Sequence, residues 1–119
     1  MTTVIMADDS GLMRTILKNF LKKAGCEVVG EAADGAAIVD VYKEKKPNLV
    51  FLDILMPGTD GISALREIKK INPLAKVVMC SSVLNEKTKA ETKALGAKIY
   101  ITKPFRGDDI NNAVKTLCG

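Results

Sequence analysis

The stretch VFLDILMPGTDG, residues 50–61, places a carboxylate inside an apolar run and follows it with a turn. Val50, Phe51 and Leu52 have the composition of a buried strand, yet Asp53 comes directly after them. An ionised carboxylate is costly to remove from water, so this position needs a reason. Either Asp53 lies at the exit of a buried strand and does chemistry there, or it is a poorly placed core residue. The neighbouring strands distinguish the two.

Five short aliphatic runs recur along the chain, and segments with helical periodicity lie between them. In the first such segment, apolar residues recur three or four positions apart from Met13 to Ala24, between a capping Ser10 and a helix-ending Gly25. Strand alternating with helix five times predicts an α/β fold of the (βα)5 type, a three-layer sandwich with helices on both faces of a parallel sheet. The runs are TVIMA at 3–7, EVVGE at 27–31, LVFLD at 49–53, KVVMCS at 76–81 and KIYIT at 98–102.

The fourth helical segment, LNEKTKAETKALG at 84–96, differs from the others because lysines and glutamates dominate it. A helix that buries so little is weakly held, which suits a surface that shifts or docks a partner. An exposed, solvated helix without a special role fits the same composition equally well.

Composition narrows the class of protein. We expect a single domain over residues 1–119, with one core and no membrane-spanning segment. Three separated cysteines indicate neither a disulfide framework nor a zinc site, which favours a reducing cytoplasm. The absence of histidine excludes Ser-His-Asp and Cys-His catalysis. The basic residues that give the net charge of +4 are interspersed with acidic residues. Aromatic residues make up only 4% of the chain, so we expect no direct nucleic-acid binding.

Polar side chains stand where the predicted strands end. Asp8 and Asp9 follow the first strand, Asp53 ends the third, Ser81 ends the fourth and Lys103 follows the fifth. Ligand sites in open parallel sheets lie outside these carboxyl ends. Three converging carboxylates repel one another without a cation, and Mg²⁺, with Mn²⁺ as an alternative, suits oxygen ligands. Taken singly, either aspartate before the first helix could instead be its cap, and Lys103 could be a surface lysine.

This set of groups suits the transfer of a phosphoryl group onto aspartate. Asp53 would supply an ionised nucleophile, which needs no general base and is consistent with the missing histidine. The metal and Lys103 would balance the charge of the transferring group, and Ser81 would donate to one of its oxygens. Asp53 is therefore predicted to be the reactive end of a buried strand.

Four motifs, in order and in spacing, make the chain resemble the receiver domain of two-component response regulators over essentially its whole length. They are ADDS at 7–10, FLDILMPGTDG at 51–61, MCSS at 79–82 and YITKPF at 100–105. The resemblance implies a flavodoxin-like fold with strand order 2-1-3-4-5. It also implies a single receiver domain, here without an output domain, that takes its phosphoryl group from a histidine kinase. Such a protein catalyses its own phosphorylation and dephosphorylation but is not a turnover enzyme.

The resemblance also assigns roles to individual residues. Asp53 becomes the phosphoacceptor, and Asp9 and Asp53 bind Mg²⁺ directly, while Asp8 acts largely through water. The backbone carbonyl of Leu55 completes the metal ligands. Lys103 becomes the phosphoryl-binding lysine, and its peptide bond to Pro104 is expected to be cis. Ser81 becomes the switch hydroxyl, and Tyr100 becomes the aromatic residue whose rotamer changes with the position of Ser81. Without the family, Tyr100 would be interpreted as an aromatic on a half-covered edge strand.

Phosphorylation is then expected to alter the face formed by the fourth helix, the fifth strand and the fifth helix. We expect this face to dock a motility switch or its adaptor, as in stand-alone chemotaxis regulators, with the protein acting as a monomer. Leu55 and Val83, each two residues beyond a site residue, are apolar and cannot orient an attacking water, which predicts a long-lived acyl phosphate. The residues expected on the docking face are Lys89, Lys93, Lys98, Tyr100, Asn112 and Lys115.

Several alternatives remain at this stage. The chain could be a phosphorelay shuttle, the receiver of a longer regulator such as a chemotaxis methylesterase, or a binding module that signals without phosphate. A haloacid dehalogenase phosphatase needs a second acid two residues beyond its nucleophile, where this chain has Leu55. A nucleotide-binding or redox domain of similar fold lacks support, because the sequence contains no Walker motif, GxGxxG or CxxC.

Overall fold

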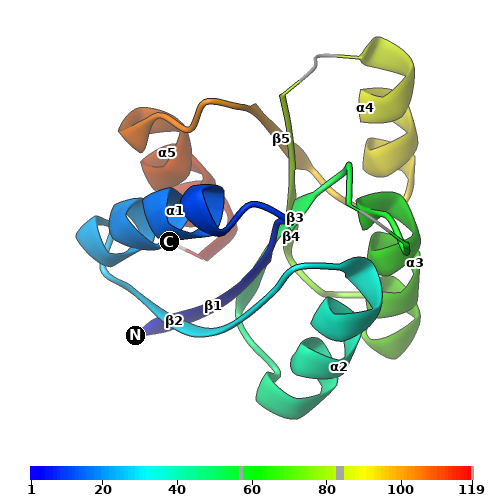
Figure 1. The fold of residues 1–119 in the computed structure, drawn as a ribbon, viewed down its shortest axis with the longest axis horizontal. Helices are drawn as coiled ribbons and strands as arrows, with labels where there is room; N and C mark the ends of the chain where they lie inside the picture. The colour runs from blue at the N-terminus through cyan, green and yellow to red at the C-terminus, as the bar shows by residue number, and fades with distance from the viewer. Residues whose placement is uncertain (57, 83–84, 119) are drawn as a thin grey trace.

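A computed structural model describes residues 1–56, 58–82 and 85–118. Strands and helices alternate through the chain as the sequence predicts, and no described helix is long and apolar enough to cross a membrane (Figure 1). The elements are β1 (Thr2–Ala7), α1 (Gly11–Lys23), β2 (Cys26–Ala32), α2 (Gly35–Lys45), β3 (Leu49–Asp53), α3 (Gly61–Ile71), β4 (Val77–Ser81), α4 (Glu86–Ala94), β5 (Ile99–Thr102) and α5 (Gly107–Cys118).

The five strands form one parallel sheet in the order β2-β1-β3-β4-β5, which confirms the predicted flavodoxin-like arrangement. Helices α1 and α5 cover one face, and α2, α3 and α4 lie on the other side (Figure 1). Strands β3 and β4 are buried along their whole length, because a sheet covered on both faces leaves neither set of side chains in water. The continuous apolar run before Asp53 is therefore a central strand.

Side chains of alternate strand residues enter two separate cores. On the α2–α3 side, Val50 and Leu52 pack with Leu65 and Ile68 of α3. On the α1–α5 side, Phe51 packs with residues of those two helices, including Leu17, Leu21 and Ile110. Strand side chains point alternately to opposite faces, so a shift of one residue in β3 would exchange the two sets. This constraint determines where β3 ends and hence where Asp53 lies.

The start and the end of α1 follow the predicted signals. The Ser10 side chain accepts a hydrogen bond from the Met13 amide (3.2 Å), and Gly25 ends the helix with a φ of 83°. Because Ser10 is the cap, neither Asp8 nor Asp9 serves as one. Both aspartates remain available for another role.

Helix α4 is the least buried of the helices that the structure describes. Thr92 is its one buried residue, and the hydroxyl of Thr92 donates to the carbonyl of Lys89 at 3.0 Å. The thin apolar content predicted from the sequence is confirmed. Helix α4 is thus held to the sheet by fewer apolar contacts than α3, which buries Ala64, Leu65 and Ile68.

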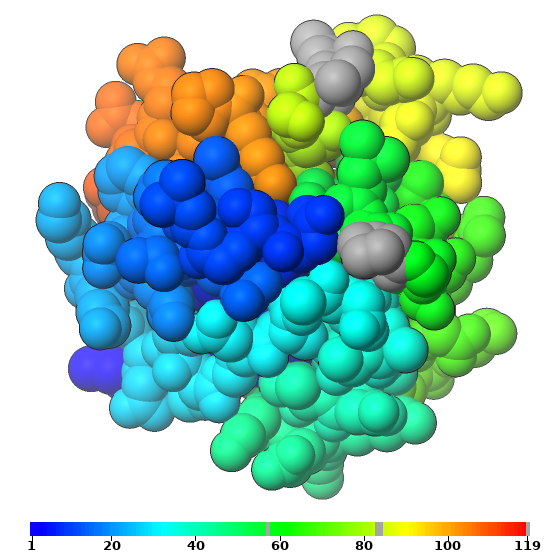
Figure 2. Space-filling model, viewed as in Figure 1, coloured from blue at the N-terminus to red at the C-terminus, as the bar shows by residue number. Residues whose placement is uncertain are grey.

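The carboxyl ends of the strands meet on one face of the molecule. Figure 2 shows the segments that follow β1, β3 and β5, in dark blue, green and orange, coming together near the centre of this face. The residues that sequence analysis singled out belong to these segments, so the topology alone brings them to a common edge.

Candidate functional site

Asp53 is the last residue of β3 and is buried, with 6% of its surface exposed. The chain turns sharply after it: the Ile54 amide donates to the Cys80 carbonyl and the Gly61 amide to the Ile54 carbonyl, each at 3.0 Å. A Cβ atom on Gly61 would collide with the backbone carbonyl of Asp53. Glycine at the start of α3 therefore lets this helix close against the end of β3 and position Asp53.

Lys103 reaches the same place from the end of β5. Its ammonium lies 2.5 Å from Oδ2 of Asp8 and 3.1 Å from Oδ2 of Asp53. The Lys103 amide donates to the Ser81 carbonyl at 2.8 Å, and the Lys103–Pro104 bond is cis, as the resemblance implied. The ammonium also lies 5.9 Å from the centre of the Phe105 ring. One cation thus joins two carboxylates from two different strands.

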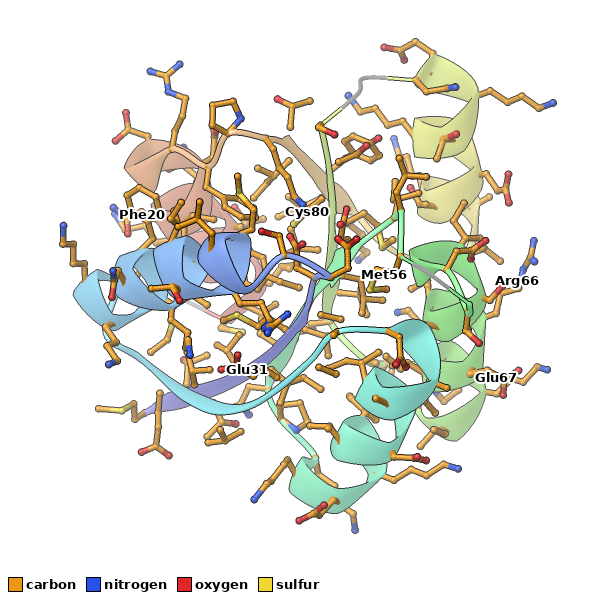
Figure 3. The ribbon with its side chains drawn as sticks, viewed as in Figure 1. Phe20, Glu31, Met56, Arg66, Glu67 and Cys80 are labelled. Atoms are coloured by element: carbon orange, nitrogen blue, oxygen red, sulfur yellow. The ribbon has the colours of Figure 1, made fainter. Side chains whose placement is uncertain are left out.

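Asp8 and Asp9 complete an acidic cluster with Asp53. Oxygens of the three carboxylates lie within 4.8 Å of one another, with Asp8 and Asp53 buried and Asp9 exposed. Oδ1 of Asp8 accepts a hydrogen bond from the Ser10 amide at 2.9 Å. Figure 3 shows oxygen atoms, in red, gathered near the centre of the view between the labels of Cys80 and Met56. The cluster is therefore open to solvent on the side of Asp9.

The electrostatics of the cluster follow from burial and from neighbouring charge. Burial raises the pKa of Asp53; the ammonium of Lys103 opposes this rise and the charge of Asp8 adds to it. Burial by itself would lower the pKa of Lys103, but its hydrogen bond to Asp8 and the charges of both carboxylates outweigh burial, and the pKa rises. Lys103 thus stays charged, and its one ammonium faces a cluster of three carboxyl groups.

The donor set fits a hard divalent cation. Mg²⁺ prefers oxygen ligands, and it is commonly bound by one or two carboxylates while it keeps several waters. The three carboxylates supply such oxygens close together, and the exposed Asp9 leaves one side open for water or a phosphoryl oxygen. An added cation would also offset the burial and the repulsion by Asp8 that raise the pKa of Asp53.

Ser81 and Tyr100 lie on the same face of the sheet. Ser81 is buried at the end of β4 and pairs with Thr102, and Met79 pairs with Tyr100. Because strand side chains alternate, Tyr100 stands diagonally across from Ser81 on the face that α2, α3 and α4 cover. Tyr100 is half-buried and packs against the core of that side. The two predicted switch residues are therefore neighbours across β4 and β5.

The residues predicted for the docking face lie on or directly beside α4, β5 and α5. Tyr100 and Asn112 line a shallow pocket of about 230 Å³ between β5 and α5. Lys98 directly precedes β5, two residues before Tyr100, and lines a different pocket. The remaining three are exposed on α4 or α5: Lys89, Lys93 and Lys115.

Arg14 is a site residue that sequence reasoning missed. Its Nη1 donates to the backbone carbonyl of Asp8 at 2.6 Å, and its Nε pairs with Glu31 at 2.9 Å, while Lys18 pairs with the same glutamate at 2.6 Å. Helical side chains point toward the N-terminus, so an arginine four residues after the cap Ser10 could have been expected to reach back to this loop. Arg14 braces the loop that carries the acidic cluster.

A parallel sheet of this order defines a flavodoxin-like domain. The carboxylates and the lysine at its carboxyl edge form a site that could bind a metal cation together with an anionic group. The sequence pattern described as the response regulator receiver domain matches residues 4–115. The chain therefore belongs to the family of response regulator receiver domains.

Several of the relatives are chemotaxis proteins. The chain is 44% identical over 115 residues to the chemotaxis protein CheY of Bacillus subtilis, covering 96% of both chains. It is 43% identical over 111 residues to CheY of Thermotoga maritima, covering 93% of this chain and 92% of the relative. A solved structure, the CheX–CheY–BeF3–Mg complex of Borrelia burgdorferi, contains a chain that superimposes with a TM-score of 0.93 at 31% identity, over 97% of this chain and 87% of that one.

Membership in this family defines a signalling protein rather than an enzyme that turns over a substrate. Receiver domains accept a phosphoryl group and bind Mg²⁺ through an acidic pocket. Those of the CheY type receive phosphoryl groups from histidine kinases and act on motility targets. The predicted resemblance and the predicted fold are both confirmed.

Proposed function

We propose that this chain accepts a phosphoryl group from a histidine kinase on Asp53, in a reaction that needs Mg²⁺, and thereby signals in chemotaxis or motility. The observation that carries the proposal is the cluster of three carboxylates within 4.8 Å with the Lys103 ammonium in contact with two of them. The similarity to chemotaxis proteins along nearly the whole chain supports the pathway. The three free cysteines support a cytoplasmic location.

The residues divide the chemistry among them. Asp8, Asp9 and Asp53, with the carbonyl of Leu55, would hold the cation, whose contribution is to neutralise charge on the phosphoryl oxygens. An oxygen of Asp53 attacks phosphorus as the bond to the donor imidazole nitrogen breaks. That nitrogen keeps the electron pair and takes a proton from solvent. Lys103 stays protonated and moves from balancing Asp53 to balancing the bound phosphoryl group.

Ser81 and Tyr100 would carry the signal away from Asp53. A phosphoryl oxygen on Asp53 would draw the Ser81 hydroxyl toward it, and the diagonal neighbour Tyr100 would move into the space left on the same face of the sheet. Helix α4, which buries one residue, can shift at small cost. These features support the face of α4, β5 and α5 as the surface that reads phosphorylation.

That face would dock the motility switch or its adaptor. Lys89 and Lys93 are exposed on α4 and Lys115 is exposed on α5, while Tyr100 and Asn112 line a pocket between β5 and α5. Substitutions there should weaken partner binding, whereas substitutions on exposed positions of α2 and α3 should not. The reverse pattern would assign docking to another surface.

The phosphorylated state is proposed to be long-lived. The Leu55 side chain is apolar and 64% exposed beside the cluster, so it cannot hold a water for attack on the acyl phosphate. Val83, the second residue in this argument, lies outside the described residues. Faster loss of phosphate from the wild type than from a Leu55→Asn variant would contradict the proposal.

The acceptor chemistry is tested by incubating the protein with acetyl phosphate and Mg²⁺ and measuring intact mass. We expect one added phosphoryl group on the wild type and none on Asp53→Asn, because the amide lacks the nucleophilic oxygen. Addition of EDTA should prevent the modification, while Asp40→Asn, at an exposed position on α2, should leave it unchanged. Equal modification of wild type and Asp53→Asn would assign the acceptor elsewhere.

A further inference from the structure

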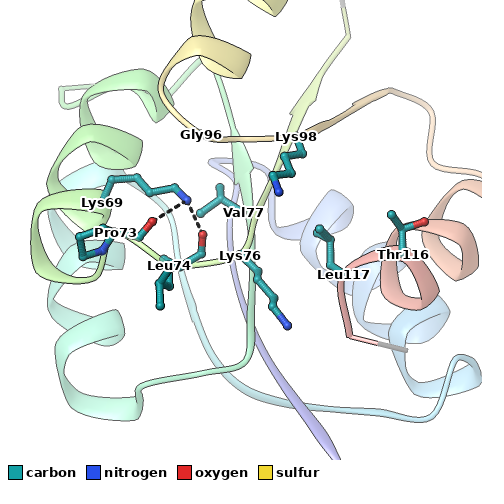
Figure 4. Close-up of a pocket in the computed structure, with 10 residues that line it drawn as sticks. Lys69, Pro73, Leu74, Lys76, Val77, Gly96, Lys98, Thr116 and Leu117 are labelled. Carbon is teal, nitrogen blue, oxygen red and sulfur yellow. Dashed lines mark hydrogen bonds between the residues drawn. The ribbon is translucent and has the colours of Figure 1, made fainter.

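A second pocket lies at the amino ends of the strands, opposite the carboxyl ends at which Asp53 lies. Its volume is about 460 Å³, and residues of α3, β4 and α5, together with the turns that precede β4 and β5, line it (Figure 4). Small-molecule sites have volumes of roughly 300–1,000 Å³, with mostly apolar walls and a few convergent polar groups. The size of the pocket thus suits a small organic ligand.

Lys69 provides a fixed cation in this pocket. Its Nζ donates to the Ala75 carbonyl at 2.5 Å and to the Pro73 carbonyl at 3.4 Å (Figure 4). The stem of Lys69 lies against Gly96, where a Cβ atom would come within 2.8 Å of Cε. A lysine ammonium has three donors, so two bonds to carbonyls leave one N–H for a ligand.

Lys98 supplies a second cation beside the first. In Figure 4 Val77 lies between Lys69 and Lys98, and Lys76 extends away from both. Burial lowers the pKa of Lys69, and the nearby charge of Lys98 lowers it further. Among the described residues, Lys69, Lys76 and Lys98 take part in no ion pair, and no residue lining the pocket is acidic. No acidic side chain among the described residues therefore compensates the positive charge of this pocket.

Apolar surface adjoins these two cations. Val77 is buried in the wall of the pocket, and Leu117 of α5 lines the far side. Leu74 stands at the pocket with 84% of its surface exposed, although a leucine gains free energy when it is removed from water. A ligand that covers Leu74 and reaches Lys69 and Lys98 must have both an apolar body and a negative charge.

We propose that this pocket binds a small organic carboxylate with an aromatic or aliphatic body. One carboxylate oxygen would accept the remaining N–H of Lys69 and the other would accept from Lys98, while the body covers Leu74 and Val77. A carboxylate on an apolar body fits this pocket better than inorganic phosphate, because phosphate would leave the exposed Leu74 in water. The site is separate from the acceptor chemistry and does not depend on the proposed function.

The test is a titration of the ¹⁵N-labelled full chain with 1-naphthoate, followed by amide chemical shifts. Saturable shifts should be confined to residues 74–77, 96–98 and 116–117. Lys98→Gln should weaken binding about fivefold, the effect of one partly exposed ion pair. Lys22→Gln, at an exposed position in the last turn of α1, removes the same charge and should leave the affinity unchanged. Leu74→Ala should weaken binding about twofold by removing apolar contact.

Two further probes separate this proposal from simple charge attraction. The neutral 1-naphthalenemethanol should bind at least about fivefold more weakly than 1-naphthoate, and inorganic phosphate should produce no saturable shifts at these residues. The proposal is wrong if no saturation is seen up to about 10 mM naphthoate. It is also wrong if phosphate binds as tightly, if the alcohol binds equally well, or if Lys22→Gln weakens binding as much as Lys98→Gln.

Discussion

The carboxyl ends and the amino ends of the strands, called here the carboxyl edge and the amino edge of the sheet, differ in how their charged side chains are paired. At the carboxyl edge, the Lys103 ammonium is in contact with Asp8 and Asp53, and the negative charge of the cluster is partly balanced within the protein. At the amino ends of the strands, Lys69 and Lys98 repel each other, and the described residues that line their pocket include no acidic side chain. At the carboxyl edge, Lys103 and an added metal ion would therefore share the carboxylates of Asp8 and Asp53. The amino edge presents two lysines to a ligand that carries a negative charge.

The difference also concerns how each site is built. Residues that directly follow buried strands form the carboxyl edge, so the backbone of the sheet positions them. Lys69 belongs to a helix and is held by carbonyl oxygens of the turn that follows it. Substitutions that displace the backbone should therefore disrupt the carboxyl edge more than the amino edge. Substitutions that remove a single charge should affect the one edge at which that charge lies.

Gly61→Ala is expected to disrupt the carboxyl edge. The added methyl group would collide with the Asp53 carbonyl, and because backbone cannot move aside as a flexible side chain does, the free energy of unfolding should fall by about 3 kcal/mol. Urea unfolding and acetyl phosphate labelling measure the loss of stability and of modification. Gly11→Ala is the matched control, because the nearest atom to its new methyl group lies at an ordinary 3.6 Å. A stable, fully labelled Gly61→Ala protein would show that α3 can retreat without displacing Asp53.

Lys103→Gln is expected to separate metal binding from phosphoryl transfer. Removing the ammonium should slow phosphorylation by roughly 100-fold, since one preorganised charge at the reacting group is lost. Mg²⁺ should bind more tightly, because no internal cation competes for Asp8 and Asp53. Calorimetric titration with Mg²⁺ and the rate of labelling measure the two effects. Lys98→Gln, which removes the same charge at the amino edge, should change neither; equal effects of both variants would mean that only net charge matters.

Glu31 is expected to make a small, pH-dependent contribution to the free energy of unfolding through its ion pairs with Lys18 and Arg14. The hydrogen bond from Lys18 lowers the pKa of Glu31, burial opposes this, and Arg14 lowers it further. A carboxyl group whose pKa is lower in the folded protein adds stability above its ordinary pKa, near 4.5, and loses it as the pH falls through the folded value. Denaturant unfolding between pH 7 and pH 3 should show a shallower decline for Glu31→Gln than for wild type. Parallel curves would mean that these exposed ion pairs contribute nothing to stability.

Predictions from the sequence succeeded where a signal was local. The apolar run before Asp53, the cap at Ser10 and the stop at Gly25 each depend on residues within a few positions of one another. Motif order then led to the family, which the match over residues 4–115 confirms. The metal ligands, the switch pair and the docking face stay predictions, because no bound ion or partner tests them. Arg14 was missed because its contact is with a backbone carbonyl, which no residue type signals.

Helical and strand periodicity, together with polar residues at the strand ends, were enough to specify an α/β fold with an acidic edge. They were enough because burial and hydrogen bonding within each segment dictate such patterns directly. Packing between distant segments decided the rest: Lys103 meets Asp8 across 95 positions of sequence, and Lys98 comes close to Lys69 of α3 at a shared pocket. Such contacts depend on strand register and on how each helix sits on the sheet, and these form only when the whole chain packs at once.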